Sequence, residues 1–81
     1  MNNHAMSLIK EYLRLSAEAS VKYGPKTFLL MQVGAFYECY GEIANRNNID
    51  EFCRTCELAC ANKAPGILMA GFRDYSLEKY L

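Results

Sequence analysis

The chain has 81 residues, which is enough for one domain, and its nine Lys and Arg residues balance nine Asp and Glu residues. A hydrophobic content of 52% supports one compact core and excludes a disordered tail. The zero net charge argues against a stand-alone polyanion-binding module, because such modules carry a basic excess that displaces counterions. It still allows a nucleic-acid contact in which other parts of a larger protein hold the phosphates.

The sequence shows no recognisable targeting signal. No apolar run approaches the roughly 20 residues that cross a bilayer, so we expect no membrane partner. The first residues lack the basic and apolar regions of a secretory signal, and the four cysteines are therefore expected as reduced thiols. These features predict an intracellular protein and leave open the nucleus, the cytoplasm, an organelle or a viral origin.

The first half of the chain predicts one helix and two strands. Apolar residues recur at helical spacing over residues 5–23, and Gly24 followed by proline ends this amphipathic pattern. A nearly continuous apolar run over residues 26–33 predicts a buried strand. Residues 36–40 predict a second strand, which Gly41 is expected to break before a polar loop.

The second half predicts two further helices and one strand. Asp50 is a good N-cap, and the apolar spacing predicts a helix from this residue to about Glu57. Residues 58–61 could extend that helix or begin a strand. The remaining predictions are a turn at residues 64–66, a buried strand over 67–71 and a helical pattern over 75–81. The order of elements favours an α/β layer architecture, and a helical pattern that stops at the last residue suggests a piece of a longer protein.

The most specific segment is Gly34-Ala35-Phe36-Tyr37-Glu38. In an extended strand, a period of two places Phe36 and Glu38 on one face and Tyr37 on the other. An apolar ring and an acceptor carboxylate would then project side by side from a bend marked by glycine. On composition alone, the alternative is that Phe36 belongs to the core and Glu38 is a solvated charge at a sheet edge.

This segment resembles the Gly-Asp-Phe-Tyr-Glu motif in the N-terminal mismatch-recognition domain (domain I) of MutS-type DNA mismatch repair proteins. Glu11-Tyr12-Leu13-Arg14-Leu15 is similar to the opening helix of that domain, and Met69-Ala70-Gly71-Phe72 to its Met-Ala-Gly segment. The similarity covers roughly residues 8–81. The chain departs from the family at Ala35, where Asp is usual, and at residues 73–75, where Pro-x-His is usual.

The resemblance implies that residues 1–81 form an α/β domain like the N-terminal domain of MutS, with a small mixed sheet flanked by helices, and that this domain binds mismatched or looped double-stranded DNA. In this family the residue matching Phe36 wedges from the minor groove beside a mispaired base, and the residue matching Glu38 hydrogen-bonds that base. Gly34, Tyr37 and Met69 are expected on the same DNA-binding surface. The chain itself is expected to be a binding module without catalytic residues, metal or cofactor, and so not an enzyme. The resemblance assigns ATP and Mg²⁺ to a distant domain of a dimeric parent protein.

Two other functions stay open at this point. One is an interaction or structural domain that keeps the fold without mismatch recognition. The other is a metal-dependent nuclease, although the acidic residues are scattered and form no recognisable metal-binding set.

The remaining candidate ligands are cysteine and basic residues. Cys53, Cys56 and Cys60 suggest zinc, but thiols on one stripe of a helix do not converge tetrahedrally, so we expect small core residues. Lys26, Lys63 and Arg73 are candidate phosphate contacts near turns, for which a solvated surface role is the alternative.

Overall fold

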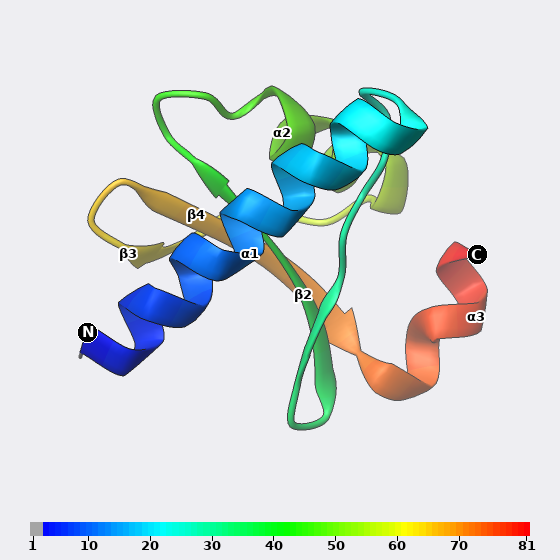
Figure 1. Ribbon diagram of the computed structural model, residues 1–81. Coiled ribbons are helices and arrows are strands. Elements are labelled where there is room, and N and C mark those ends of the chain that lie inside the picture. Colours follow the sequence, from blue (N-terminus) through cyan, green and yellow to red (C-terminus); the bar gives the residue numbers. More distant parts are fainter. Residues whose placement is uncertain (1–2) are drawn as a thin grey trace.

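Four β-strands and three α-helices make up residues 3–81, the part of the chain that the computed structural model describes (Figure 1). The elements are α1 (Asn3–Tyr23), β1 (Met31–Val33), β2 (Phe36–Glu42), α2 (Asn47–Cys56), β3 (Ala61–Ala64), β4 (Ile67–Arg73), the single 3-10 turn η1 (Asp74–Ser76) and α3 (Leu77–Tyr80). None of the helices in this part of the chain combines the length and the apolar character needed to cross a bilayer.

The strands form one sheet in the order β1-β2-β4-β3, and every pair is antiparallel. The α/β class is therefore confirmed, whereas the prediction of a mixed sheet is wrong. Two of the three pairs are hairpins with two-residue loops, which can join only antiparallel strands. Gly34 and Gly66 supply the positive φ angles, 58° and 77°, that such tight turns require.

The predicted buried strand over residues 26–33 is mostly wrong. Only Met31–Val33 pairs with a neighbouring strand, and this short edge strand is half-buried to exposed. Upstream of it, backbone oxygens bind helix side chains instead of a strand. The Asn48 amide donates to the Thr27 oxygen at 3.1 Å, and the Tyr12 hydroxyl donates to the Leu29 oxygen at 2.6 Å. Docking of the two long helices therefore takes the place of sheet pairing here.

Gly41 does not break β2, contrary to prediction. The strand continues through it to Glu42, and a Cβ atom at position 41 would lie only 2.6 Å from Cγ2 of Ile49. The missing side chain thus allows α2 to pack directly against the strand. Asp50 is not the N-cap either, because α2 begins at Asn47; Asp50 lies in its first turn and pairs with Arg46 at 2.9 Å.

The later boundaries are close to the prediction. Residues 58–61 do not extend α2, and β3 begins at Ala61. Ala64 belongs to β3, so the predicted turn narrows to two residues, and β4 runs on to Arg73.

The core lies between the sheet and the helices. The buried hydrophobic residues are Ile9 and Tyr12 from α1, Cys39 and Tyr40 from β2, Ile49 and Phe52 from α2, and Ile67, Leu68, Ala70 and Phe72 from β4. Tyr12 connects several of these elements, since its ring meets that of Tyr40 edge-on at 5.1 Å and its hydroxyl oxygen lies 3.1 Å from the Cys39 sulfur. The predicted amphipathic helix over residues 5–23 is confirmed as α1.

Candidate nucleic-acid interface

Two of the three segments that carry the family resemblance, residues 34–38 and 69–72, lie on the neighbouring central strands β2 and β4 and the turn before β2. Glu38 is opposite Gly71, and Tyr37 is opposite Phe72. The β1–β2 hairpin extends away from α1 and α2 and ends in a free turn, as Figure 1 shows. We call residues 33–36 and Arg73 the hairpin tip. The fold thus places motifs that are distant in the sequence on one projecting part of the molecule.

Phe36 is the exposed aromatic group of the hairpin tip. It is 39% exposed and has Val33 opposite it in β1 and Arg73 opposite it in β4. The Arg73 guanidinium carbon lies 4.8 Å from the centre of the Phe36 ring, a cation–π contact. The Asp74 amide donates to the Ala35 oxygen at 2.8 Å and holds the end of β4 against the turn. The tip therefore presents a flat apolar surface with a cation beside it.

Glu38 lies on the same face as Phe36 but is buried, with only 8% of its surface exposed. The Tyr40 hydroxyl donates a hydrogen bond to its Oε1 atom. Gly71 makes room for it, because a Cβ atom at position 71 would lie 3.1 Å from the Glu38 Cγ and 2.6 Å from the Tyr37 oxygen. The carboxylate is thus held flat against the sheet between its neighbours.

The shared face of Phe36 and Glu38 agrees with the strand period, but their joint projection into solvent does not occur. The alternative, a core Phe36 and a solvated Glu38, is also wrong, since the exposures are the reverse. The physical reason is position along the strand. Phe36 is the first residue of β2 and stands beside the turn, whereas Glu38 lies two residues further into the strand, where the Tyr40 hydroxyl binds it.

Tyr40 is buried between Glu38 and the ring of Tyr12. Burial, followed by its hydrogen bond with Glu38, raises the pKa of the Tyr40 hydroxyl above the ordinary value of 10.0. Burial also raises the pKa of Tyr12. A tyrosine in the unfolded chain loses its proton near pH 10, whereas these two keep theirs in the folded chain.

Because the unfolded state binds fewer protons than the folded state at alkaline pH, the free energy of unfolding is expected to fall as the pH rises through the ordinary pKa values of thiols and tyrosines. The buried thiols of Cys39, Cys53 and Cys56 contribute to this fall together with Tyr12 and Tyr40. In Tyr40→Phe one of the two tyrosines is removed, so the fall between about pH 8 and pH 11 should be shallower. Urea titrations across this range measure the effect. Tyr75→Phe is the control, because Tyr75 is 81% exposed and its variant should match the wild-type slope. Equal slopes for all three proteins would contradict this interpretation.

The other predicted DNA-binding residues divide between the two faces of the sheet. Met69 is opposite Tyr40, on the face that carries Glu38, and Gly34 forms the turn at the end of this face. Tyr37 points to the other face, where its ring lies 5.9 Å from that of Phe72. The structure therefore places Phe36, Glu38 and Met69 on one face of the sheet, with Met69 opposite Tyr40 and away from the hairpin tip, and leaves Tyr37 in a packing role.

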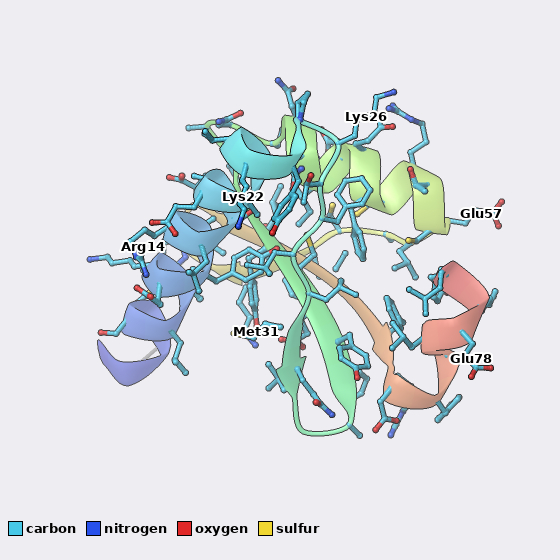
Figure 2. All side chains as sticks on the ribbon, turned by 45° about the vertical axis from the view of Figure 1, so that its right-hand side comes forward. Arg14, Lys22, Lys26, Met31, Glu57 and Glu78 are labelled. Carbon is cyan, nitrogen blue, oxygen red and sulfur yellow. The ribbon has the colours of Figure 1, made fainter. Side chains whose placement is uncertain are left out.

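The basic candidates are not equivalent. Arg73 belongs to the hairpin tip, and Lys63 lines a cavity of about 140 Å³ between α1 and β1, together with Tyr40 and Val33. Lys26 lies far from Met31, the β1 residue opposite Glu38, as Figure 2 shows. Arg73 is thus the candidate that stands beside Phe36.

Sequence reasoning missed the two pairs that shape this site, Arg73 with Phe36 and Tyr40 with Glu38. Period two places Tyr40 on the face of Glu38 but does not show their hydrogen bond. For the pair of Arg73 and Phe36, Gly71 carried a signal, because a glycine inside a strand often marks a close approach of another chain segment. Pairing it with Glu38 would have placed Arg73 opposite Phe36 by counting two residues along each strand.

No three His, Cys, Asp or Glu side chains among the described residues are arranged to hold a metal ion. The cysteines suggested for zinc are half-buried, and two of them, Cys53 and Cys60, touch through their sulfur atoms at 3.0 Å. Cys39 is fully buried under Tyr12.

A comparison with protein-family models and with curated proteins finds no match to this chain. The family resemblance therefore rests on the segments quoted above.

Proposed function

We propose that this chain is a MutS domain I-like module that binds mismatched or looped duplex DNA through the hairpin tip. The observation that carries the proposal is the exposed Phe36 ring at the end of a projecting hairpin, with the Arg73 guanidinium 4.8 Å from it. Inserting such a ring between base steps costs a few kcal/mol of unstacking, and less where base pairing is already defective. Stacking on the displaced base returns about 1–3 kcal/mol. Because the unstacking cost is lower at a mismatch or loop, the chain should bind defective duplex more tightly than fully paired duplex, and this difference in affinity is the discrimination.

Arg73 provides the charge that this neutral domain otherwise lacks at the tip. Within the described residues, its guanidinium forms no salt bridge with a carboxylate. It is therefore available to a phosphate or to the negative potential of a minor groove while Phe36 stacks on a base.

Glu38 would act as the discriminating group. Phosphate repulsion disfavours a carboxylate near any duplex, and only a displaced base offers a hydrogen bond that offsets this repulsion. Since Tyr40 binds the Oε1 atom, the second oxygen, Oε2, is the one left for a base.

The hydrogen bond between Tyr40 and Glu38 also favours a second function. Glu38 is 8% exposed and already hydrogen-bonded, as expected of a structural carboxylate in an interaction domain that does not distinguish mismatches. The two functions differ in whether the buried Glu38 carboxylate contributes to the discrimination between mismatched and fully paired DNA.

A titration with three fluorescently labelled duplexes separates the candidates. Fully paired, G·T-mismatched and looped DNA of one length are titrated with the chain at low salt, with and without Mg²⁺. Tighter binding of the mismatched and looped duplexes is the expected result, and affinity should be weak at physiological salt because the net charge is zero. Equal binding of all three supports the interaction domain, and Mg²⁺-dependent cutting of the DNA supports a nuclease.

Arg73→Ala is expected to weaken binding to all three duplexes alike. Loss of one phosphate contact should also reduce the slope of log K against log salt by about 1. Arg54→Ala is the matched control, since it removes the same charge from the exposed face of α2, where Arg54 pairs with Glu51. If both variants lower the slope equally, Arg73 acts through net charge and not through its place at the tip.

A further inference from the structure

Cys53 and Cys60 form a close thiol pair outside the proposed DNA surface. Their sulfur atoms lie 3.0 Å apart, within hydrogen-bonding distance for thiols. Both residues are half-buried, and all four cysteines of the described chain are free thiols. The pair joins the end of α2 to the residue that precedes β3.

The backbone holds this pair together. After α2 the chain reverses at Glu57, which has left-handed backbone angles (φ 56°, ψ 44°). The amides of Glu57 and Leu58 both donate to the Cys53 oxygen, the latter at 2.9 Å. This closed turn returns the chain so that Cys60 lies against Cys53. The contact thus follows from the fold of the loop as well as from side-chain rotamers.

We propose that Cys53 and Cys60 are a site of reversible covalent modification that exchanges with small-molecule disulfides, such as oxidised glutathione, and closes to an intramolecular disulfide. The two sulfurs need to approach by only about 1 Å to reach a disulfide bond length near 2.05 Å. The bond would tie the C-terminal end of α2 to the start of β3.

The exchange balances in two steps. The Cys60 thiolate attacks one sulfur of oxidised glutathione, whose disulfide breaks and releases the first glutathione as a thiolate. The Cys53 thiolate then attacks the Cys60 sulfur of the mixed disulfide and releases the second glutathione. Two protein thiols are oxidised to one disulfide, one glutathione disulfide is reduced to two thiols, and the two protons lost by the protein are taken up by the two glutathione thiolates.

The order of attack follows from the surroundings of Cys53. Burial, and then the hydrogen bond with Cys60, raise the pKa of the Cys53 thiol to about 12. A raised pKa lowers the thiolate fraction of Cys53 and disfavours it as the first nucleophile.

The other two thiols lack this arrangement. Cys39 is fully buried, and its sulfur lies 3.1 Å from the Tyr12 hydroxyl oxygen. Cys56 is half-buried, three residues after Cys53 on the same helix, and no contact between it and another sulfur is formed within the described residues. Cys56 is the natural control, because it shares the helix and the partial burial.

The test incubates the full chain with oxidised glutathione at neutral pH, alkylates the remaining thiols after denaturation, and maps the products by mass spectrometry. Free thiols are expected to fall from four to two in the monomer, with the lost pair mapping to Cys53 and Cys60 and returning on reduction. Cys56→Ser should give the same disulfide. Cys53→Ser should stop at one glutathione on Cys60, and near-UV circular dichroism verifies that each variant is folded.

Four alkylated thiols after incubation would overturn the proposal. So would a disulfide that involves Cys56 or Cys39, a disulfide between two chains, or a single glutathione adduct that persists in the wild type. None of these results depends on DNA binding, so the proposal stands or falls separately from the proposed function.

Discussion

Replacing Phe36 with alanine is expected to remove the preference for G·T-mismatched or looped duplex while leaving affinity for fully paired duplex nearly unchanged. Phe36 is the exposed aromatic ring of the hairpin tip, and alanine cannot enter a base stack. Loss of about 1–3 kcal/mol of stacking corresponds to a fall of roughly 5-fold to 150-fold in the ratio of the two affinities. Competition between labelled mismatched duplex and unlabelled paired duplex measures this ratio.

Val33→Ala is the matched control for this experiment. Val33 lies directly opposite Phe36 and is 42% exposed. Its replacement by alanine removes apolar surface from the same tip without removing an aromatic ring. Its affinity ratio should stay close to that of the wild type. If the two variants lose discrimination equally, general apolar contact at the tip is responsible and the wedge role of Phe36 is wrong.

Gly71→Ala is expected to be the most destabilising small substitution in the sheet. A Cβ atom at this position would lie 2.6 Å from the Tyr37 backbone oxygen, which cannot move without separating β2 from β4. It would also press on the Glu38 Cγ atom at 3.1 Å. Overpacking of this kind costs about 2–3 kcal/mol, a large share of the roughly 4–12 kcal/mol expected for a domain of this size.

Urea unfolding followed by tyrosine fluorescence measures this loss of stability. Gly66→Ala is the control that distinguishes a steric clash from backbone strain. Nothing lies within 4 Å of a Cβ atom at position 66, but its φ angle of 77° disfavours alanine. Strain without a clash should cost about 1 kcal/mol. A cost for Gly71→Ala no larger than this would show that the central strands yield easily, and that Gly71 is not needed to seat Glu38.

Local pattern was enough to predict much of this fold. Alternation along residues 36–40 placed Phe36 and Glu38 on one face, and helical spacing placed α1, because both depend only on the geometry of one element. Gly41 and Asp50 were misinterpreted because their roles depend on the docking of α2. Gly41 accepts the side chain of Ile49, and Asp50 pairs with Arg46 inside the helix.

The candidate site was predictable in membership but not in exposure. Period two tells which residues share a face, but burial depends on the partner strands. Glu38 is buried because Gly71 is opposite it and Tyr40 binds it, and Phe36 is exposed because only Arg73 and Val33 flank it. The pairing of Glu38 with Gly71 and of Phe36 with Arg73 does not follow from local sequence, since β2 and β4 are joined through α2 and β3.

The central claim, that Phe36 enters the base stack at a defect, is tested most directly with 2-aminopurine placed beside a G·T mismatch. The fluorescence of this base reports its stacking. Addition of the wild-type chain at low salt should change the fluorescence of the mismatched duplex and leave that of the fully paired duplex unchanged. Phe36→Ala should abolish the change, and Val33→Ala should keep it. The same change in paired and mismatched DNA, or a change that persists in Phe36→Ala, would contradict the account.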